Sequence, residues 1–206
     1  MASQDKSGKH GSRTNRPVRP ETPSEVLELR VQLQYIEPPV WRRLRIRSSA
    51  TLADLHDAIQ AAMGWSDSHL HEFFISGRRY GPLHEDAPEE LIDEAKIVLA
   101  SLGLKPATRF TYNYDFGDNW AHDIRVEKIE AMAAELLRSL CLNGARACPP
   151  EDCGGPPGYQ ELLAALANPR HPRHRELRRW VGKDWDAERF DLEAANRALR
   201  SRSPGK

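Results

Sequence analysis

The sequence predicts an α+β fold in which an antiparallel sheet built from hairpins packs with an early helix and a C-terminal group of helices. Three observations support this prediction. Segments of alternating polarity fill most of the first two thirds of the 206 residues, one helical segment interrupts them early, and helical periodicity dominates the last third. Strands segregated from helices in this way are typical of α+β proteins rather than doubly wound ones.

The first expected hairpin covers residues 27–47. Apolar and polar residues alternate over 27–35, which indicates a half-buried strand. Pro38 and Pro39 turn the chain into a second strand over 40–47. The apolar face of that strand carries Val40, Leu44 and Ile46, and its other face carries Trp41, Arg43, Arg45 and Arg47. We therefore expect a hairpin with a basic outer face.

The expected early helix begins after Thr51 and is ended by Gly64. Thr51 and Asp54 have the spacing of a capping box, with Asp in place of the usual Glu. A strand is predicted over 70–75, followed by a turn over 77–82 with Tyr80 as its anchor. Residues 84–95 are expected to form a loop or a short helix, and 97–104 fit either helix or strand.

The clearest hairpin spans residues 109–129, where Phe110, Tyr112, Tyr114 and Phe116 should share one face. The turn has the sequence Gly-Asp-Asn at 117–119. Helices are predicted over 131–140, 159–167, 173–181 and 191–200, with an irregular segment rich in Pro, Gly and Cys over 141–158.

The domain organisation follows from composition. Residues 1–24 are basic and nearly without aliphatic side chains, so we expect a disordered arm. Residues 25–200 are expected to form one domain, followed by a disordered tail over 201–206. No apolar run reaches the roughly 20 residues that a bilayer span requires, and no secretion signal is evident. We therefore expect a cytoplasmic protein with no membrane partner.

Charge is distributed unevenly although Lys+Arg and Asp+Glu both number 30. The arm and the segment 168–206 are basic, whereas 25–167 is acidic. This locates any nucleic-acid contact at the basic termini and any cation in the acidic middle. The basic runs 42–47 and 170–179 either contact phosphates or form ordinary solvated faces.

His69 and His71 are the first candidate metal ligands. On a strand, residues two apart project to the same face, so both imidazoles could hold one ion. The alternative is a pair of polar side chains on a solvated face.

A second candidate cluster lies around the turn of the 109–129 hairpin. Asp115, Asp118, His122 and Asp123 are gathered there, and the aspartates either bind an ion or only fix the turn. His122 shares a face with Trp120 and Ile124, where an unpaired imidazole is costly to bury. It therefore needs a carboxylate, a carbonyl or a metal as partner.

Cys148 and Cys153 form the third candidate cluster. A C-x4-C spacing permits zinc ligation but is weaker evidence than paired C-x2-C knuckles. Gly154 and Gly155 either pre-orient the thiols or let the loop lie close against the sheet. Three cysteines, including Cys141, rule out a disulfide scaffold in a reducing compartment. Phosphate-loop, dinucleotide, serine-hydrolase and zinc-protease motifs are absent from the sequence.

Four segments together resemble the plasmid pRiA4b Orf-three-like family, which includes resolvase-labelled passenger proteins of insertion elements. They are IEPPVWRRLRI, TLADLHDAIQAAMGWSDSHLHEF, FTYNYDFGDNWAHDI and CPPEDCGGPPGY. The resemblance covers about residues 25–200 and implies a compact α+β domain of plasmids and mobile elements, without an established activity. It also implies one common site where the His-x-His strand, the 114–124 hairpin and the cysteine loop converge. The matching stretches include Trp41, Arg43, Trp65, Tyr80, Asp115, Trp120, Asp152 and Tyr159, and we expect all of these except Asp152 to contribute to partner binding.

Three functions are compatible with these residues. The first is a binding or accessory module that recognises a nucleic acid or a protein partner. The second is a metal-dependent hydrolase in which Asp115 acts as base. Its ion would be held by His69, His71, Asp118 and His122. The third is a structural site for zinc or another divalent metal, closed by Cys148, Cys153 and histidines.

Overall fold

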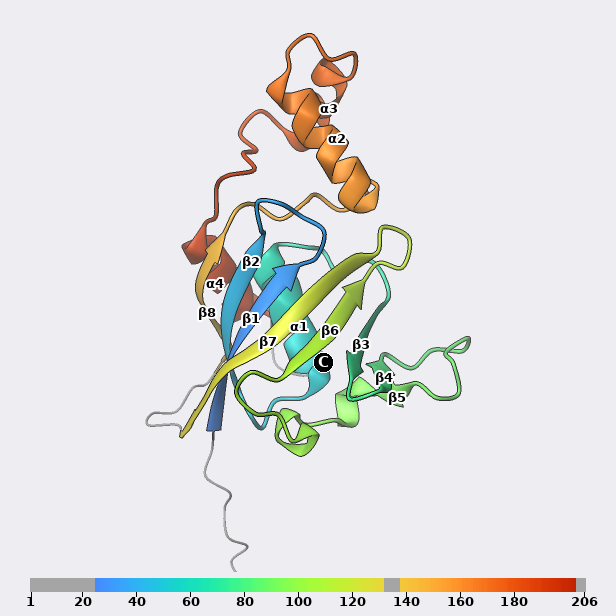
Figure 1. Ribbon diagram of the computed structural model, residues 1–206, viewed down its shortest axis with the longest axis vertical. Coiled ribbons are helices and arrows are strands. Elements are labelled where there is room, and N and C mark those ends of the chain that lie inside the picture. Colours follow the sequence, from blue (N-terminus) through green and yellow to red (C-terminus); the bar gives the residue numbers. More distant parts are fainter. Residues whose placement is uncertain (1–24, 132–137, 203–206) are drawn as a thin grey trace, which may run out of the picture.

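One sheet organises the part of the chain that the computed structural model describes, residues 25–131 and 138–202 (Figure 1). Its strand order is β5-β4-β3-β6-β7-β1-β2-β8, and all neighbours are antiparallel except β4 and β5. The strands are β1 (Glu25–Leu33), β2 (Trp41–Arg47), β3 (His71–Ile75), β4 (Arg78–Gly81), β5 (Ile92–Asp93), β6 (Arg109–Tyr114), β7 (Trp120–Ala131) and β8 (Leu140–Ala145). The helices are α1 (Leu52–Met63), α2 (Gly155–Ala167), α3 (His174–Val181) and α4 (Leu192–Ser201), with short 3-10 turns η1 (Glu94–Lys96) and η2 (Leu99–Leu102). The predicted α+β class is confirmed.

The first hairpin forms as predicted, but its outer face is not a free basic surface. Arg43 pairs with Glu127 of β7 at 2.5 Å, and Arg45 pairs with Glu28 of β1. The sequence pattern could not reveal this, because Glu127 reaches the hairpin only through the pairing of β1 with β7.

Helix α1 begins and ends with the predicted signals. Thr51 Oγ1 accepts a hydrogen bond from Asp54 N at 3.1 Å, and the Asp54 carboxylate accepts one from Thr51 N at 2.8 Å. Gly64 ends the helix with φ 89°. Arg42 of β2 is buried on the same face as Leu44 and Ile46, as the alternation places it, and its guanidinium donates to the carbonyl of Ala62 in the last helical turn. A cation at this end also complements the helix dipole.

The β6–β7 hairpin confirms the predicted pairing and corrects one residue. Phe110, Tyr112 and Tyr114 are buried together, whereas Phe116 is 50% exposed. The alternation stops at Asp115, whose φ of 58° turns the chain out of the strand.

Strand β8 was not predicted, since residues 141–158 were expected to be irregular. It pairs with β2, a contact between segments about 100 residues apart. Of the helix predicted over 131–140, residues 132–137 lie outside the described residues, while Ala131 ends β7 and Leu140 begins β8. Residues 84–104 supply β5 and the two 3-10 turns, and Tyr80 is buried in β4 rather than in a turn.

The C-terminal helices form two groups. Helix α4 contacts α1 and β8, whereas α2 and α3 contact each other beyond one end of the sheet (Figure 1). Helix α4 ends at Ser201, and Arg202 pairs with Asp57 of α1 at 3.2 Å, so the folded part extends past residue 200. The arm over 1–24 and the tail residues 203–206 lie outside the described residues. Within the described ranges, no helix is long and apolar enough to cross a bilayer.

Candidate metal centre

Three chain segments meet where β3 begins and the β6–β7 hairpin turns. His69 precedes β3, Asp115 follows β6, and Asp152 lies in the loop before α2. One ligand atom from each of these side chains lies within 4.8 Å of the other two. We call His69, Asp115 and Asp152 the rim triad. It takes one residue from each of the three segments that the sequence analysis expected to converge.

Backbone hydrogen bonds set the position of Asp115 in the rim triad. Its amide donates to the carbonyl of Leu70 at 2.9 Å, which ties the hairpin turn to the segment carrying His69. Its Oδ1 accepts a hydrogen bond from the amide of Gly117 at 2.9 Å. The other carboxylate oxygen, Oδ2, is the one nearest His69.

The loop carrying Asp152 can approach the hairpin because α2 begins with Gly155, and a second glycine of that helix, Gly158, lets the loop fold against it. A Cβ on Gly155 would lie 2.3 Å from the carbonyl oxygen of Asp118, and one on Gly158 would lie 1.9 Å from that of Cys153. Gly154 N also donates to Asp118 Oδ2 at 3.1 Å. Asp118 therefore holds the loop rather than contributing to the rim triad.

Glu151 anchors the same loop from the other side. Tyr114 Oη donates to it at 2.6 Å, and Ser66 donates from its hydroxyl at 2.7 Å. Burial opposes ionisation of Glu151, but these hydrogen bonds outweigh it and hold its pKa below the ordinary value. Burial and the neighbouring Glu151 raise the pKa of Tyr114 to about 12. Tyr114 therefore stays neutral and donates the hydrogen bond, and Glu151 stays charged and accepts it.

The distances within the rim triad fit a shared cation rather than hydrogen bonds. His69 Nε2 lies 3.7 Å from Asp115 Oδ2 and 3.4 Å from Asp152 Oδ1. Hydrogen bonds between such atoms span about 2.7–3.2 Å. His69 Nε2 is shielded from solvent and has no hydrogen-bond partner among the described residues. Ligands about 2.1 Å from a tetrahedral ion lie roughly 3.4 Å from one another, so the two distances from His69 are close to two edges of such a site.

A second cluster lies in the core between α1 and the sheet. Gln60 Nε2 donates to Tyr112 Oη at 3.0 Å, so the tyrosine proton is directed to His56 Nδ1, 2.8 Å away. His56 Nε2 then donates to Asp67 at 2.8 Å. Burial raises the pKa of Tyr112 well above its ordinary value, which keeps the hydroxyl protonated.

His71 completes this second cluster. Its ring stacks on that of His56 with centroids 3.4 Å apart and planes 6° from parallel. His71 Nε2 lies 2.9 and 3.0 Å from the two oxygens of Glu94, and both residues are buried. We call His56 and His71, with their carboxylates Asp67 and Glu94, the buried histidine pair.

The buried histidine pair does not fit a shared metal, although His56, Asp67 and His71 also bring ligand atoms within 4.8 Å. The nitrogen lone pairs lie in the ring planes, and the planes are parallel. An ion midway between the rings would lie about 1.7 Å out of each ring plane. Because metal–nitrogen bonds are only about 2.0 Å long, neither in-plane lone pair could point at that ion. Each Nε2 also has a carboxylate at hydrogen-bonding distance.

The structure therefore separates His69 from His71. His69 lies in a bend before β3 begins at His71, so the alternation rule does not extend to it. His122 is also apart from the rim triad: it is fully buried, and its Nδ1 lies 3.3 Å from the carbonyl of Tyr112. Burial lowers the pKa of His122 to about 4. The four-residue ligand set expected for a hydrolase is not assembled.

The cysteines belong to neither ligand group within the described residues. Burial raises the pKa of the Cys148 thiol, and burial with nearby Asp118 raises that of Cys153 to about 12. Metal ligation requires the thiolate, which these environments disfavour. The glycine-rich loop thus brings a carboxylate, not a thiol, to the rim.

The residues expected to contact a partner are distributed over the molecule. Trp65, Tyr80, Trp120 and Tyr159 are buried, so they support the core. Trp41 lies on the outer face of the sheet beneath the guanidinium of Arg30, 4.1 Å from the ring centroid, and Arg43 is ion-paired.

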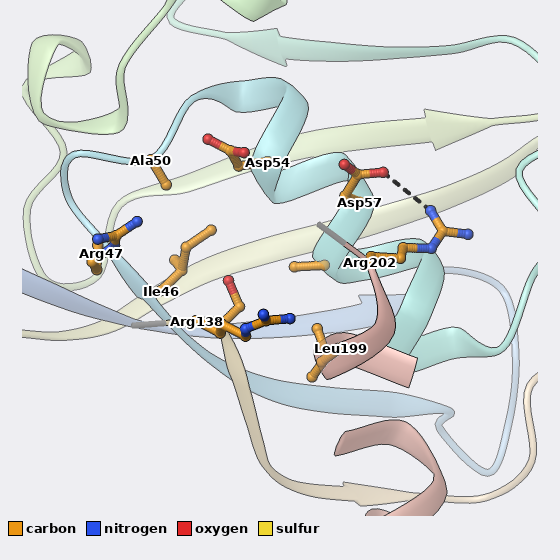
Figure 2. Close-up of a pocket in the computed structure, with 10 residues that line it drawn as sticks. Ile46, Arg47, Ala50, Asp54, Asp57, Arg138, Leu199 and Arg202 are labelled. Carbon is orange, nitrogen blue, oxygen red and sulfur yellow. Dashed lines mark hydrogen bonds and ion pairs between the residues drawn. The ribbon is translucent and has the colours of Figure 1, made fainter. Parts of the chain in front are cut away.

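A pocket between α1 and α4 is a weaker candidate site (Figure 2). Figure 2 shows Asp57 and Arg202 joined by an ion pair at its edge. The carboxylate of Asp54, also in its lining, already accepts a hydrogen bond from Thr51 N in the capping box of α1. The volume of ≈ 50 Å³ leaves room for water rather than for a metabolite.

The sequence analysis did not single out Asp152 as a ligand, nor any member of the second cluster except His71. One signal was available for that cluster. His56 and Gln60 are four residues apart on the otherwise apolar stripe of α1, which predicts a buried polar network. Asp67 and Glu94 carried no local signal, because only the tertiary fold brings them to the imidazoles.

Comparisons with known proteins identify relatives over most of the chain. A family profile described as "Plasmid pRiA4b ORF-3-like protein" matches residues 25–194. An uncharacterized protein of Sinorhizobium fredii, y4hQ, is 38% identical over 179 residues, covering 85% of this chain and 91% of the relative. The crystal structure of MM3350, a protein of unknown function from Methanosarcina mazei, is similar with a TM-score of 0.77 and 36% identity, covering 84% of this chain and 98% of that one.

Proposed function

The chain belongs to the plasmid pRiA4b ORF-3-like family, and we propose that it is a divalent-cation-binding accessory domain whose ion is held by the rim triad. The observation that carries the proposal is the spacing of His69 Nε2 from the two aspartates. At 3.4 and 3.7 Å these atoms are too far apart for good hydrogen bonds and are spaced as ligands of one ion. The plasmid origin in the family description makes a role beside mobile elements part of the proposal.

The donor set indicates which ions would bind. One imidazole and two carboxylates suit Zn²⁺ or Mn²⁺ better than a soft thiophilic ion. Three protein ligands leave at least one coordination position open. The Asp152 side chain is 74% exposed, so water or a partner's donor atom can reach that position.

Binding is favoured over hydrolysis by the state of the neighbouring carboxylates. A hydrolase needs a base that can take a proton from the metal-bound water. Glu151 is held by Tyr114 and Ser66 with its pKa lowered, and Asp118 accepts from Gly154. Among the described residues near the rim triad, these carboxylates are committed to holding the loop.

Calorimetric titration of tag-free protein with ZnCl₂ and with MnCl₂ tests the proposal. We expect the wild type to bind one ion per chain. His69→Ala should bind it about 100-fold or more weakly, because a ligand is removed. His84→Ala is the matched control, since His84 is exposed and belongs to neither cluster. No binding of either ion by the wild type, or equal binding by the two variants, overturns the proposal.

A further inference from the structure

A shallow concavity of ≈ 490 Å³ lies against α3, remote in sequence from the rim triad. Every residue that lines it is a basic type. They are His174, Arg175, Arg178, Arg179 and Lys183. Phosphates are the ligands that such a surface would attract most strongly.

Three of these charges are not neutralised by the described part of the chain. Arg175, Arg179 and Lys183 are exposed, and no carboxylate of the described residues lies within 4.0 Å of them. Arg178 donates to the carbonyl of Trp185 at 3.1 Å, which fixes its guanidinium in the concavity. His174 is likewise oriented by the carbonyl of Ala165, 2.7 Å away.

Other arginine-rich surfaces of the molecule differ from this one. On the outer face of the sheet, Arg43 and Arg109 are paired with Glu127 and Asp123. Near α3 itself, Arg173 is held by two glutamates of α2 and α3. The concavity therefore concentrates cations that ion pairs elsewhere cancel.

Trp180 of the same helix lies outside the concavity. Its residue is 48% exposed, and it lines separate hollows beside α3, one of them with Asp152 and Glu176. Helix α3 has only eight residues, and its Leu177 is buried, so it presents no apolar face to a membrane.

We propose that the α3 concavity binds nucleic acid through its phosphates, which contact Arg175, Arg179 and Lys183. This goes beyond cation binding and does not depend on it. No base contact is part of the proposal, so single strands and duplexes should both bind. With about three phosphates contacted, affinity should fall roughly tenfold between 50 and 150 mM salt.

Fluorescence anisotropy with a labelled 20-nucleotide single strand tests this on the full chain. We expect Arg175→Glu with Arg179→Glu to weaken binding at least about tenfold, because two phosphate contacts are lost and two negative charges are added. The control double variant is Arg189→Glu with Arg197→Glu, which makes the same change in charge at exposed positions outside the concavity. It should bind within about twofold of the wild type.

Three outcomes overturn the proposal, provided that circular dichroism melts show folded variants. They are no binding by the wild type at 50 mM salt, an equal loss in the control, and an unchanged affinity in the α3 variant, which would assign binding to another basic segment. If the α3 variant lost binding to phosphatidylserine vesicles but kept its affinity for nucleic acid, the surface would be assigned to membranes instead.

Discussion

The rim triad and the buried histidine pair both combine imidazoles with carboxylates, and one histidine of each, His69 and His71, is only two residues from the other in the chain. In the buried pair, each imidazole has a carboxylate at 2.8–3.0 Å and a neighbouring ring at 3.4 Å. In the rim triad, the imidazole nitrogen stands 3.4–3.7 Å from two carboxylates and has no hydrogen-bond partner among the described residues. The types of residue present therefore do not distinguish the two clusters. The distances do: the imidazoles of the buried pair are hydrogen-bonded to carboxylates, whereas the imidazole nitrogen of the rim triad is not.

We infer that the buried histidine pair contributes to stability, whereas the rim triad is the proposed site of ion binding. The buried pair links α1 to the sheet through Tyr112 and to the 3-10 turn through Glu94. The rim triad joins the segments that flank β3, β6 and α2, and its Asp152 is exposed. Variants of the two clusters should therefore change different measurements.

The largest expected effect is on stability in His56→Ala. The change leaves a cavity and removes the partners of buried Tyr112 and of Asp67, so we expect the free energy of unfolding to fall by about 3–4 kcal/mol. Urea unfolding measures this, with His84→Ala within about 0.5 kcal/mol of the wild type as control. His56→Gln, which keeps one hydrogen bond, should lose less. A folded His56 variant that no longer binds Zn²⁺ or Mn²⁺ would contradict the separation of the two clusters.

His122 should give the stability of the fold a pH dependence. Burial lowers its pKa to about 4, whereas an unfolded histidine titrates near 6.5. Between these values the unfolded chain takes up a proton that the folded chain refuses. Its contribution to stability is therefore complete above about pH 6.5 and is lost as the pH falls toward 4, by about 3 kcal/mol in total.

Urea unfolding at several pH values between 7.5 and 4 measures this loss. Other groups also titrate in this range, so the quantity of interest is the difference in slope between the wild type and His122→Gln. His84→Gln should keep the wild-type slope. Identical slopes for all three proteins would show that His122 does not titrate as its burial implies.

Local chemistry predicted those elements whose cause lies within a few residues. Helix α1 begins at the capping box of Thr51 and Asp54 and ends at Gly64, as expected. The aromatic alternation of the 109–129 hairpin corresponds to β6 and β7. Strand β8 could not be predicted in this way, because it is a strand only by pairing with β2.

The candidate site was predictable by segment but not by residue. The expected convergence region contains His69, Asp115 and Asp152, yet the backbone conformation at the start of β3 decides which histidine faces it. The bend before β3 turns His69 to the rim, and the strand turns His71 to the core. The cysteines of the same loop are partly buried against the core, so the adjacent carboxylate reaches the rim instead.

Gly155→Ala tests whether the close contact of loop and hairpin supports the rim triad. Its φ is +66° and an added Cβ would meet the Asp118 carbonyl, so we expect a loss of about 2–3 kcal/mol in stability and about tenfold in metal affinity. Gly103→Ala is a matched control, since its φ is +63° with nothing within 4 Å of the added Cβ. That variant should lose only about 1 kcal/mol, from backbone strain, and bind the ion normally. Equal metal affinity in both variants would show that the loop contact does not position Asp152.

The smallest effect on stability, and the sharpest contrast with His56, is expected for Asp152→Asn. The Asp152 side chain is 74% exposed and approaches His69, so the free energy of unfolding should change by less than about 0.5 kcal/mol. Calorimetry should nevertheless show metal affinity reduced at least about tenfold, since a neutral amide replaces a charged ligand. Asp86→Asn, at another exposed position, should change neither quantity. If Asp152→Asn kept full metal affinity, Asp152 would not be a ligand of the ion. The loop that carries it would then contribute only to packing.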